Sequence, residues 1–347
     1  MKHLVLTSAT AAVLLVAAVW NHAVAANYRD SATGSYLEDI RNIQEYLFNN
    51  QFKMADSLAT LLARQYPDDA AGYLFRAITL ITRMFDREEE TDSRAFHAYV
   101  DSTLTKARVV LDTATVPRER AWMHLFAGHA LAYRSLWEAH FGSLLRAIKI
   151  GRRARDEYRQ GLICDNTLYD LYFGLGLFNY WKSAKAGLLR TIGLVHNDMD
   201  KGMQQLRLAA DSSLISRQSA RNALVWVWLD RGQYDSVIAQ CLKLRDRYPQ
   251  GKSILWPLGQ AYYETGQYHR AAEIYESLRQ RLAESPGNYY NLIECDFFLY
   301  RVYEKLRQHD RAEAIAARAR TYMDEIPGET RHRQRAKIAF LRRAARS

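Results

Sequence analysis

The 347-residue sequence has few residues that interrupt helices and few cysteines, with 6 Pro, 17 Gly and 3 Cys. So little proline, with glycine scattered along the chain, is typical of a nearly all-helical protein. Cys164, Cys241 and Cys295 allow one disulfide at most and leave at least one thiol, and no C-x-x-C spacing occurs. We therefore expect all three to be small buried residues rather than a metal or redox site.

Long apolar runs are also missing, except at the N-terminus. Residues 4–20 are an apolar run that follows a short basic start and precedes the small-residue sequence Ala23-Val24-Ala25. This pattern predicts a secretory signal peptide over residues 1–25, cleaved between Ala25 and Ala26, with an uncleaved anchor as the alternative. No later segment approaches about 18 uninterrupted apolar residues, so we expect a periplasmic or secreted mature chain without a transmembrane segment.

Sequence motifs of catalysis are lacking as well. No P-loop and no nucleophile elbow occurs, and the G-x-G of Gly174 and Gly176 has no third glycine at the required spacing. His124, His129 and His140 cluster with Glu138, but none of the histidines has the i, i+4 spacing of a zinc-binding helix. We expect no enzyme, no metal and no cofactor.

Positive charge is in excess, with a formal net charge of +10, and it is unevenly placed. One basic cluster comprises Arg152, Arg153 and Arg155, and the other fills a predicted C-terminal helix, residues 329–347. In a cytosolic protein this excess would indicate nucleic acid. Behind a signal peptide the expected anions are lipid headgroups, acidic glycans or an acidic protein, with a solvated helix face as the alternative. We therefore expect no nucleic acid, and the basic C-terminus is either a solvated helix face or a site for an anionic surface.

A repeat is the most informative feature that the sequence does contain. Gly232-Gln233-Tyr234 recurs as Gly266-Gln267-Tyr268, 34 positions later. Around the second copy the spacing W-x2-L-G-x2-Y is kept with Leu in place of Trp, and A-x3-F is kept with Tyr in place of Phe, at Leu255, Leu258, Gly259, Tyr262, Ala271 and Tyr275. These residues resemble tetratricopeptide repeats. The resemblance implies an all-α, right-handed superhelix, or α-solenoid, of helical hairpins.

The apolar pattern extends this frame over the rest of the chain. Apolar residues follow i, i+3, i+4 spacing, and breaks fall every 12 to 20 residues. The pattern predicts one domain, residues 26–347, with about seven hairpins and a C-terminal capping helix. A segment rich in Gly, Leu and Lys, residues 183–197, interrupts the fourth unit as an irregular insertion.

The fourth unit carries a second resemblance. Phe173-Gly174-Leu175-Gly176-Leu177-Phe178-Asn179, followed by Asp200-Lys201-Gly202, is similar to the central motif of the eukaryotic tetratricopeptide-repeat-39 and Iml2-like proteins. In that family a Ser-Leu-Leu-Pro turn follows the first helix, whereas this chain has Ser183-Ala184-Lys185-Ala186-Gly187. The resemblance implies helical repeats with a non-catalytic role.

Aromatic residues indicate a candidate binding surface. In a tetratricopeptide hairpin the first helix lines the concave groove, and projecting that face gives the candidate groove residues Phe173, Leu177, Tyr180, Asn222, Trp226, Trp256, Gln260 and Tyr263. Aromatic and amide side chains suit an extended peptide or an apolar ligand. The alternative is that these bulky side chains fill gaps between neighbouring repeats.

Two functions follow from the sequence. The first is an exported scaffold that holds a protein or peptide of the cell envelope in the concave groove. The alternative is a carrier for a small or lipid-like ligand near residues 183–197, because long irregular insertions are often functional.

Overall fold

The computed structural model describes residues 35–185 and 196–345, and every regular element among them is a helix. The helices are α2 (Ser35–Phe48), α3 (Phe52–Gln65), α4 (Ala71–Arg87), α5 (Ser93–Thr113), α6 (Pro117–Phe141), α7 (Leu144–Cys164), α8 (Leu171–Ala184), α10 (Met199–Ser212), α11 (Arg217–Asp230), α12 (Tyr234–Arg247), α13 (Leu255–Glu264), α14 (Tyr268–Ala283), α15 (Tyr289–Lys305), α16 (His309–Arg320), α17 (Gly328–Arg333) and α18 (Arg335–Ala344). The all-helical prediction is confirmed for these residues.

Four hairpin turns share one backbone geometry. Each has a residue with positive φ directly before a glutamine, namely Asn50, Gly232, Gly266 and Arg307. The amide of the following glutamine donates to the carbonyl five residues earlier, as Gln233 does to Trp228 O at 2.8 Å. This 6→1 bond is the Schellman cap of a helix that ends in a left-handed residue. The Gly-Gln repeat of the sequence therefore encodes a helix stop.

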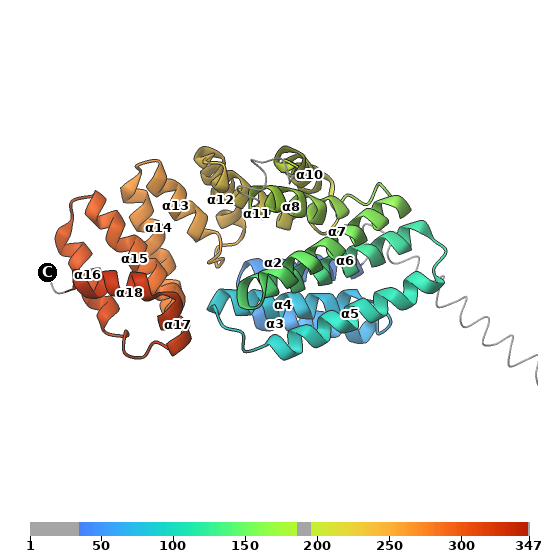
Figure 1. Cartoon of the computed structure of the whole chain (residues 1–347), viewed down its shortest axis with the longest axis horizontal. Coiled ribbons are helices and arrows are strands. Elements are labelled where there is room, and N and C mark those ends of the chain that lie inside the picture. The colour runs from blue at the N-terminus through green and yellow to red at the C-terminus, as the bar shows by residue number, and fades with distance from the viewer. Residues whose placement is uncertain (1–34, 186–195, 346–347) are drawn as a thin grey trace, which may run out of the picture.

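The helices form seven antiparallel hairpins, from α2/α3 to α15/α16, followed by α17 and α18. Successive first helices from α2 to α13 contact one another, whereas successive second helices have no contact of similar extent in the described part of the chain. The first helices therefore form the inner layer of a curved array. Figure 1 shows α2 to α7 at one end, α13 to α18 at the other, and α8 to α12 joining them along one side.

Small residues set how closely the helices of a hairpin approach. A Cβ added to Gly259 would lie 2.7 Å from the ring of Tyr275, and one added to Gly128 would lie 2.5 Å from the ring of Tyr158. Both distances are well below van der Waals contact, so each tyrosine ring occupies the space that the glycine leaves open. The Leu-Gly spacing of the repeat thus has a packing cause.

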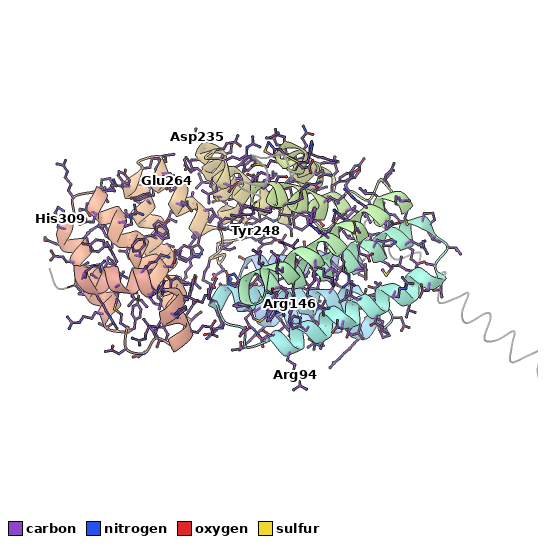
Figure 2. All side chains as sticks on the ribbon, in the orientation of Figure 1. Arg94, Arg146, Asp235, Tyr248, Glu264 and His309 are labelled. Atoms are coloured by element: carbon purple, nitrogen blue, oxygen red, sulfur yellow. The ribbon has the colours of Figure 1, made fainter. Side chains whose placement is uncertain are left out.

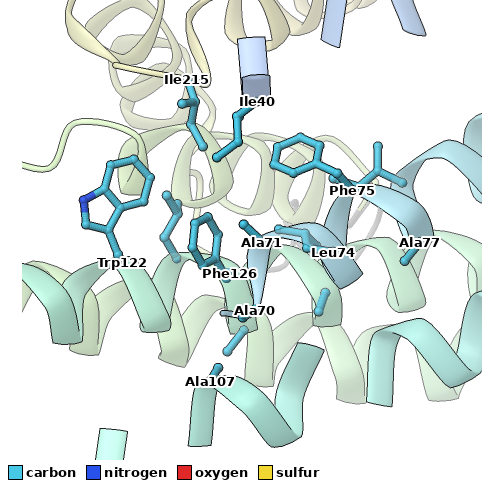
Figure 3. Close-up of a cluster of buried hydrophobic side chains, with 14 of the residues drawn as sticks. Ile40, Ala70, Ala71, Leu74, Phe75, Ala77, Ala107, Trp122, Phe126 and Ile215 are labelled. Atoms are coloured by element: carbon cyan, nitrogen blue, oxygen red, sulfur yellow. The ribbon is translucent and has the colours of Figure 1, made fainter. Parts of the chain in front are cut away.

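The apolar core is divided into three clusters along the array. The first belongs to α2–α8 and contains large buried residues such as Phe75, Trp122 and Phe126 (Figure 3). A small cluster joins α8, α10 and α11, and the third belongs to α11–α18. Cys241 and Cys295 are buried in the third cluster, Cys164 is half-buried beside the first, and all three are free thiols.

The array closes on itself, which the sequence did not indicate. Glu45 of α2 accepts from Arg247 at 2.7 Å, and the ring of Phe48 stacks on that of Tyr248, the residue labelled in Figure 2 where α12 ends. The backbone amide of Lys252 donates to Asn50 at 2.8 Å, and the Lys252 ammonium lies 2.7 Å from Asp86. The first two hairpins therefore contact the loops between the later ones.

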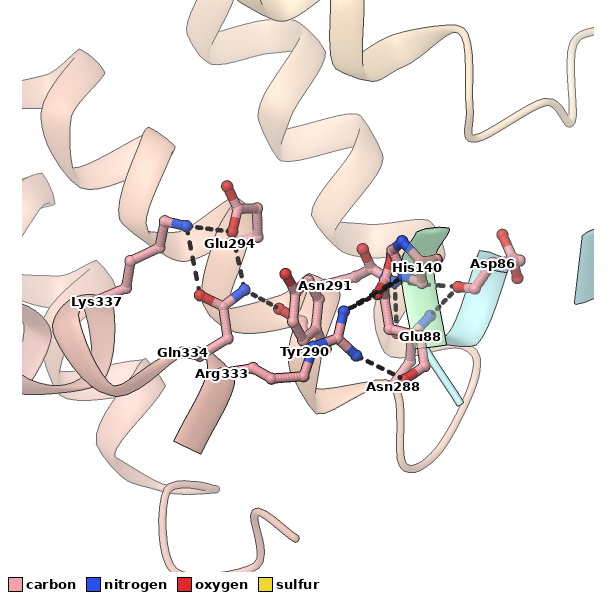
Figure 4. Close-up of polar contacts among 10 residues, drawn as sticks. All are labelled: Asp86, Glu88, His140, Asn288, Tyr290, Asn291, Glu294, Arg333, Gln334 and Lys337. Atoms are coloured by element: carbon pink, nitrogen blue, oxygen red, sulfur yellow. Dashed lines mark hydrogen bonds and ion pairs between the residues drawn. The ribbon is translucent and has the colours of Figure 1, made fainter. Parts of the chain in front are cut away.

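A polar network extends this closing contact to the C-terminus (Figure 4). The carbonyl of Asp86 accepts from the side chains of Asn288 and Asn291, at 3.0 and 3.1 Å. Glu88 accepts from Arg333 at 2.6 Å and contacts His140 at 2.7 Å. The charged loop after α4 is therefore a structural connector between the two ends of the array.

The predicted C-terminal helix over residues 329–347 is not continuous. It consists of α17 and α18, separated by Gln334. The buried amide of Gln334 donates to Tyr290 O at 3.4 Å and to Glu294 at 2.8 Å, which fixes the break against α15. Within residues 35–185 and 196–345, no helix is both long and apolar enough to cross a membrane. The predicted signal peptide and most of the 183–197 insertion lie outside the described residues.

Candidate concave binding surface

Helix α11 presents the most exposed of the candidate groove residues. Its core side consists of Ala220, Leu224 and Val227, which are buried. Asn222 and Trp226 lie one turn apart, away from that side, and Trp226 is 38% exposed. An exposed indole on the inner layer of an array is a surface that a partner can bury.

Helix α13 continues this surface with three half-buried residues, Trp256, Gln260 and Tyr263. Trp256 packs edge-on against Tyr275, with ring centroids 6.4 Å apart. The ring of Tyr263 lies between Tyr268 and the guanidinium of Arg301, the latter 5.3 Å from its centroid. These side chains pack between helices and leave part of their surface accessible.

Helix α8 contributes less than the sequence predicted. Phe173 and Leu177 are half-buried, and Phe173 packs edge-on against His129 at 5.8 Å. Tyr180 is fully buried, so its placement in the groove was wrong. Its hydroxyl donates to Asp230 at 2.7 Å, and burial raises the pKa of Tyr180 above its usual range. Tyr180 therefore joins α8 to α11 instead of facing a ligand.

Helix α15 is the first helix of the last hairpin. It carries two further residues on the same face, Phe297 and Arg301, which were not among the residues predicted from the sequence. Phe297 and Arg301 stand 41 positions after Trp256 and Gln260, the offset by which the last hairpin follows the previous one. The ring of Phe297 packs edge-on against Phe340 of α18 at 5.2 Å, and Lys337 lies 5.8 Å from its centroid. The cap thus packs on Phe297, which stays half-buried, whereas Arg301 is exposed, so the accessible surface of α8, α11 and α13 continues onto Arg301 of α15.

The clustered histidines each contact a separate partner. His124 contacts Glu157, His129 contacts the Tyr158 hydroxyl, each at 2.8 Å, and His140 contacts Glu88. Burial lowers the pKa of His129 to about 4, so this residue is a neutral core histidine at pH 7. In the described part of the chain, no group of three His, Cys, Asp or Glu residues could hold a metal ion.

Comparison with known proteins finds similar solved structures but no matching sequence. No protein-family model and no curated protein sequence matches the chain. Its structure is similar to that of aspartyl phosphate phosphatase F from Bacillus subtilis, with 16% identity, a TM-score of 0.43, and coverage of 85% of this chain and 76% of that one. It is also similar to a tetratricopeptide repeat protein from Parabacteroides merdae, with 15% identity, a TM-score of 0.38, and coverage of 90% and 99%.

The fold is a tetratricopeptide-like α-solenoid. The seven hairpins, the Schellman turns of four of them and the inner layer of first helices carry this assignment. The narrower resemblance to the tetratricopeptide-repeat-39 and Iml2-like proteins is not confirmed and stays a prediction from the sequence.

Proposed function

We propose that this protein is an exported scaffold that binds a protein or peptide of the cell envelope on the inner faces of α8, α11 and α13. The observation that carries the proposal is the exposed indole of Trp226, next to Asn222 and in line with the half-buried residues of α13. Indole and amide groups together bind peptides well, because the ring supplies apolar area and the amide supplies hydrogen bonds to backbone. The role is binding and not catalysis.

Export rests on the predicted signal peptide, and it is a separate part of the proposal. Residues 1–25 would direct the chain out of the cytoplasm, and residues 26–347 would act in the periplasm or outside the cell. Sequencing the N-terminus of the protein isolated from its host tests this part, and we expect Ala26 as the first residue. The carrier function depends on the 183–197 insertion and stays a prediction from the sequence.

The binding surface is tested by capture from the envelope fraction of the host, with proteins and small molecules identified by mass spectrometry. Trp226→Ala combined with Trp256→Ala removes the two indoles of the surface. Leu144→Ala combined with Leu145→Ala is a matched control, because these leucines are exposed on α7 and belong to a second helix. We expect the captured protein to be lost with the first pair and kept with the second.

Binding of the identified partner should then be measured with purified components. A hot-spot tryptophan typically contributes about 2 kcal/mol or more, which corresponds to a loss of about 30-fold in affinity. An affinity unchanged by the tryptophan substitutions would place the partner elsewhere on the molecule. A stoichiometric small molecule without any protein partner would favour the carrier function instead.

A further inference from the structure

The basic residues of α17 and α18 fall into two groups. Arg333 and Lys337 each pair with a carboxylate of another helix or loop at 2.6 Å, Arg333 with Glu88 and Lys337 with Glu294. These two charges are neutralised within the fold, where they attach the cap to α15 and to the loop after α4. Arg333 and Lys337 are therefore not available to bind an anionic ligand.

The second group lines a cavity of about 360 Å³ on the cap, formed by Arg331, Arg335, Ile338, Ala339, Arg342 and Arg343. No acidic side chain belongs to this lining. Among the residues that the structure describes, the one carboxylate within ion-pair distance of Arg331, Arg335 or Arg342 is Asp324, 3.9 Å from Arg342. Asp324 is 99% exposed, so this pair is solvated and weak.

Arg331 is held in place by neutral groups. Its Nη2 donates to the carbonyls of Met323, Asp324 and Ile326, at 3.2, 3.5 and 3.3 Å. Backbone carbonyls fix the position of the guanidinium without cancelling its charge. A guanidinium that is already fixed loses less conformational entropy when it binds an anion. Arg331 is therefore a positioned cation at the edge of the cavity.

The cavity also has an apolar wall. Ile338 is buried beneath it and Ala339 lies exposed beside it, so the small side chain of Ala339 leaves space between Arg335 and Arg342. The volume is at the lower end of the range for small-ligand sites, about 300–1,000 Å³. It can hold a compact group but not a folded partner.

We propose that this cavity is a binding site for a phosphate group. Each guanidinium has five N–H donors in a planar fork, and two of them can bind two oxygens of one phosphate. The forks of Arg335 and Arg342, together with the remaining donors of Arg331, offer more donors than the two oxygens of a carboxylate accept, whereas a phosphate ester or pyrophosphate supplies three or more oxygens. The phosphate belongs to a lipid headgroup or to a soluble phosphate ester, which present the same oxygens.

The site uses α17 and α18 and shares no residue with the inner faces of α8, α11 and α13. It is therefore independent of the proposed scaffold function. It is also a specific site at which the basic C-terminus could bind the anionic partner considered from the sequence. The protein would then have two binding surfaces, one aromatic and one basic.

The test uses the full chain and the variant Arg335→Ala/Arg342→Ala, which keeps the structural Arg331. Arg152→Ala/Arg153→Ala is the matched control, because it removes the same charge from exposed positions on α7. Pyrophosphate binding is measured by calorimetry at low salt, and vesicle binding by co-sedimentation with phosphatidylglycerol against phosphatidylcholine. We expect the first variant to weaken binding at least tenfold and the control to remain within twofold of the parent.

The pattern of binding distinguishes the two sources of phosphate. Saturable pyrophosphate binding that depends on Arg335 and Arg342 supports a soluble ester, and dependence on them only with phosphatidylglycerol vesicles supports a headgroup. Arg335→Lys/Arg342→Lys should weaken binding by an intermediate factor, because lysine keeps the charge but not the fork. The proposal is overturned if neither probe binds the parent, or if the α7 control loses as much binding as Arg335→Ala/Arg342→Ala. Matching melting temperatures establish that the variants are folded.

Discussion

The two ends of the array are built differently. The N-terminal hairpins have long helices, up to the 25 residues of α6, and a core dominated by bulky apolar side chains. Among its buried polar side chains, His129 and Tyr158 form a neutral pair, and the buried carboxylate of Asp69 accepts from the neutral hydroxyl of Tyr36 at 3.0 Å. The C-terminal hairpins have helices of at most 17 residues, and they bury a carboxylate that is paired with two arginines, that of Asp296. The comparison teaches that one solenoid can be stabilised by apolar bulk at one end and by a charge network at the other.

Removing the buried charge should have the largest effect. Asp296 accepts from Arg279 at 3.0 Å, from the Tyr322 hydroxyl at 2.7 Å and from Arg318 at 3.3 Å. Asp296→Ala leaves these donors without their acceptor, and breaking a buried pair typically costs about 3–5 kcal/mol. We expect a loss of this size in the free energy of unfolding, measured by urea denaturation.

The matched control is Asp112→Ala, which breaks an ion pair with Arg108 in which both side chains are more than half exposed. Exposed pairs contribute about 0–1 kcal/mol. Equal losses for Asp296→Ala and Asp112→Ala would mean that the charge network does not stabilise the C-terminal end.

The stability of the N-terminal end should depend on pH through His129. Burial lowers the pKa of His129 from 6.5 to about 4, so folding favours the neutral ring. The stability that this provides is complete above pH 6.5, and it is lost progressively as the pH falls through 4. A difference of about 2.5 pKa units corresponds to about 3 kcal/mol at most. In His129→Gln, unfolding measured between pH 7 and 4.5 should lose less stability than in the parent.

His309→Gln is the control for this experiment, because His309 is exposed on α16. It should leave the pH dependence as it is in the parent. If His129→Gln and the parent lost the same stability on acidification, the acid sensitivity of the N-terminal end would come from other groups.

The contact that joins the two ends should have the smallest effect. The side chains of Lys252 and Asp86 are largely, but not completely, buried. Because some solvent reaches them, Asp86→Ala should cost about 1–2 kcal/mol, less than a fully buried pair. Lys252→Met combined with Asp86→Ala should recover part of this loss, because no unpaired ammonium remains. A double-mutant cycle in urea measures the coupling, and strict additivity would mean that the two residues do not stabilise the closure.

Local features of this fold were predictable from the sequence. The hairpins, the helix stops at Gly232 and Gly266, and the packing at Gly259 all depend on residues within one repeat. The contact of Asn50 with Lys252 spans 202 positions, and no local pattern encodes such a pair. For the same reason the sequence did not predict the break at Gln334, which depends on hydrogen bonds to α15.

The candidate surface was predicted in part. Trp226 is exposed because α11 needs only its other side for the core, which periodicity reveals. Tyr180 has the same periodicity, but it is buried because its hydroxyl reaches Asp230 of the next hairpin. That contact depends on the spacing between two hairpins, which periodicity does not give. The 41-residue offset could have identified Phe297 and Arg301, but no local pattern predicts the contact of Phe297 with α18.

The closing contact also constrains how this chain can change over generations. An open solenoid can gain or lose a unit, because each repeat contacts only its neighbours. Here an added hairpin between α5 and α12 would move Lys252 away from Asp86 and Arg333 away from Glu88 at the same time. The number of repeats is therefore fixed by geometry, and variation should be concentrated in side chains and loops rather than in the count of hairpins.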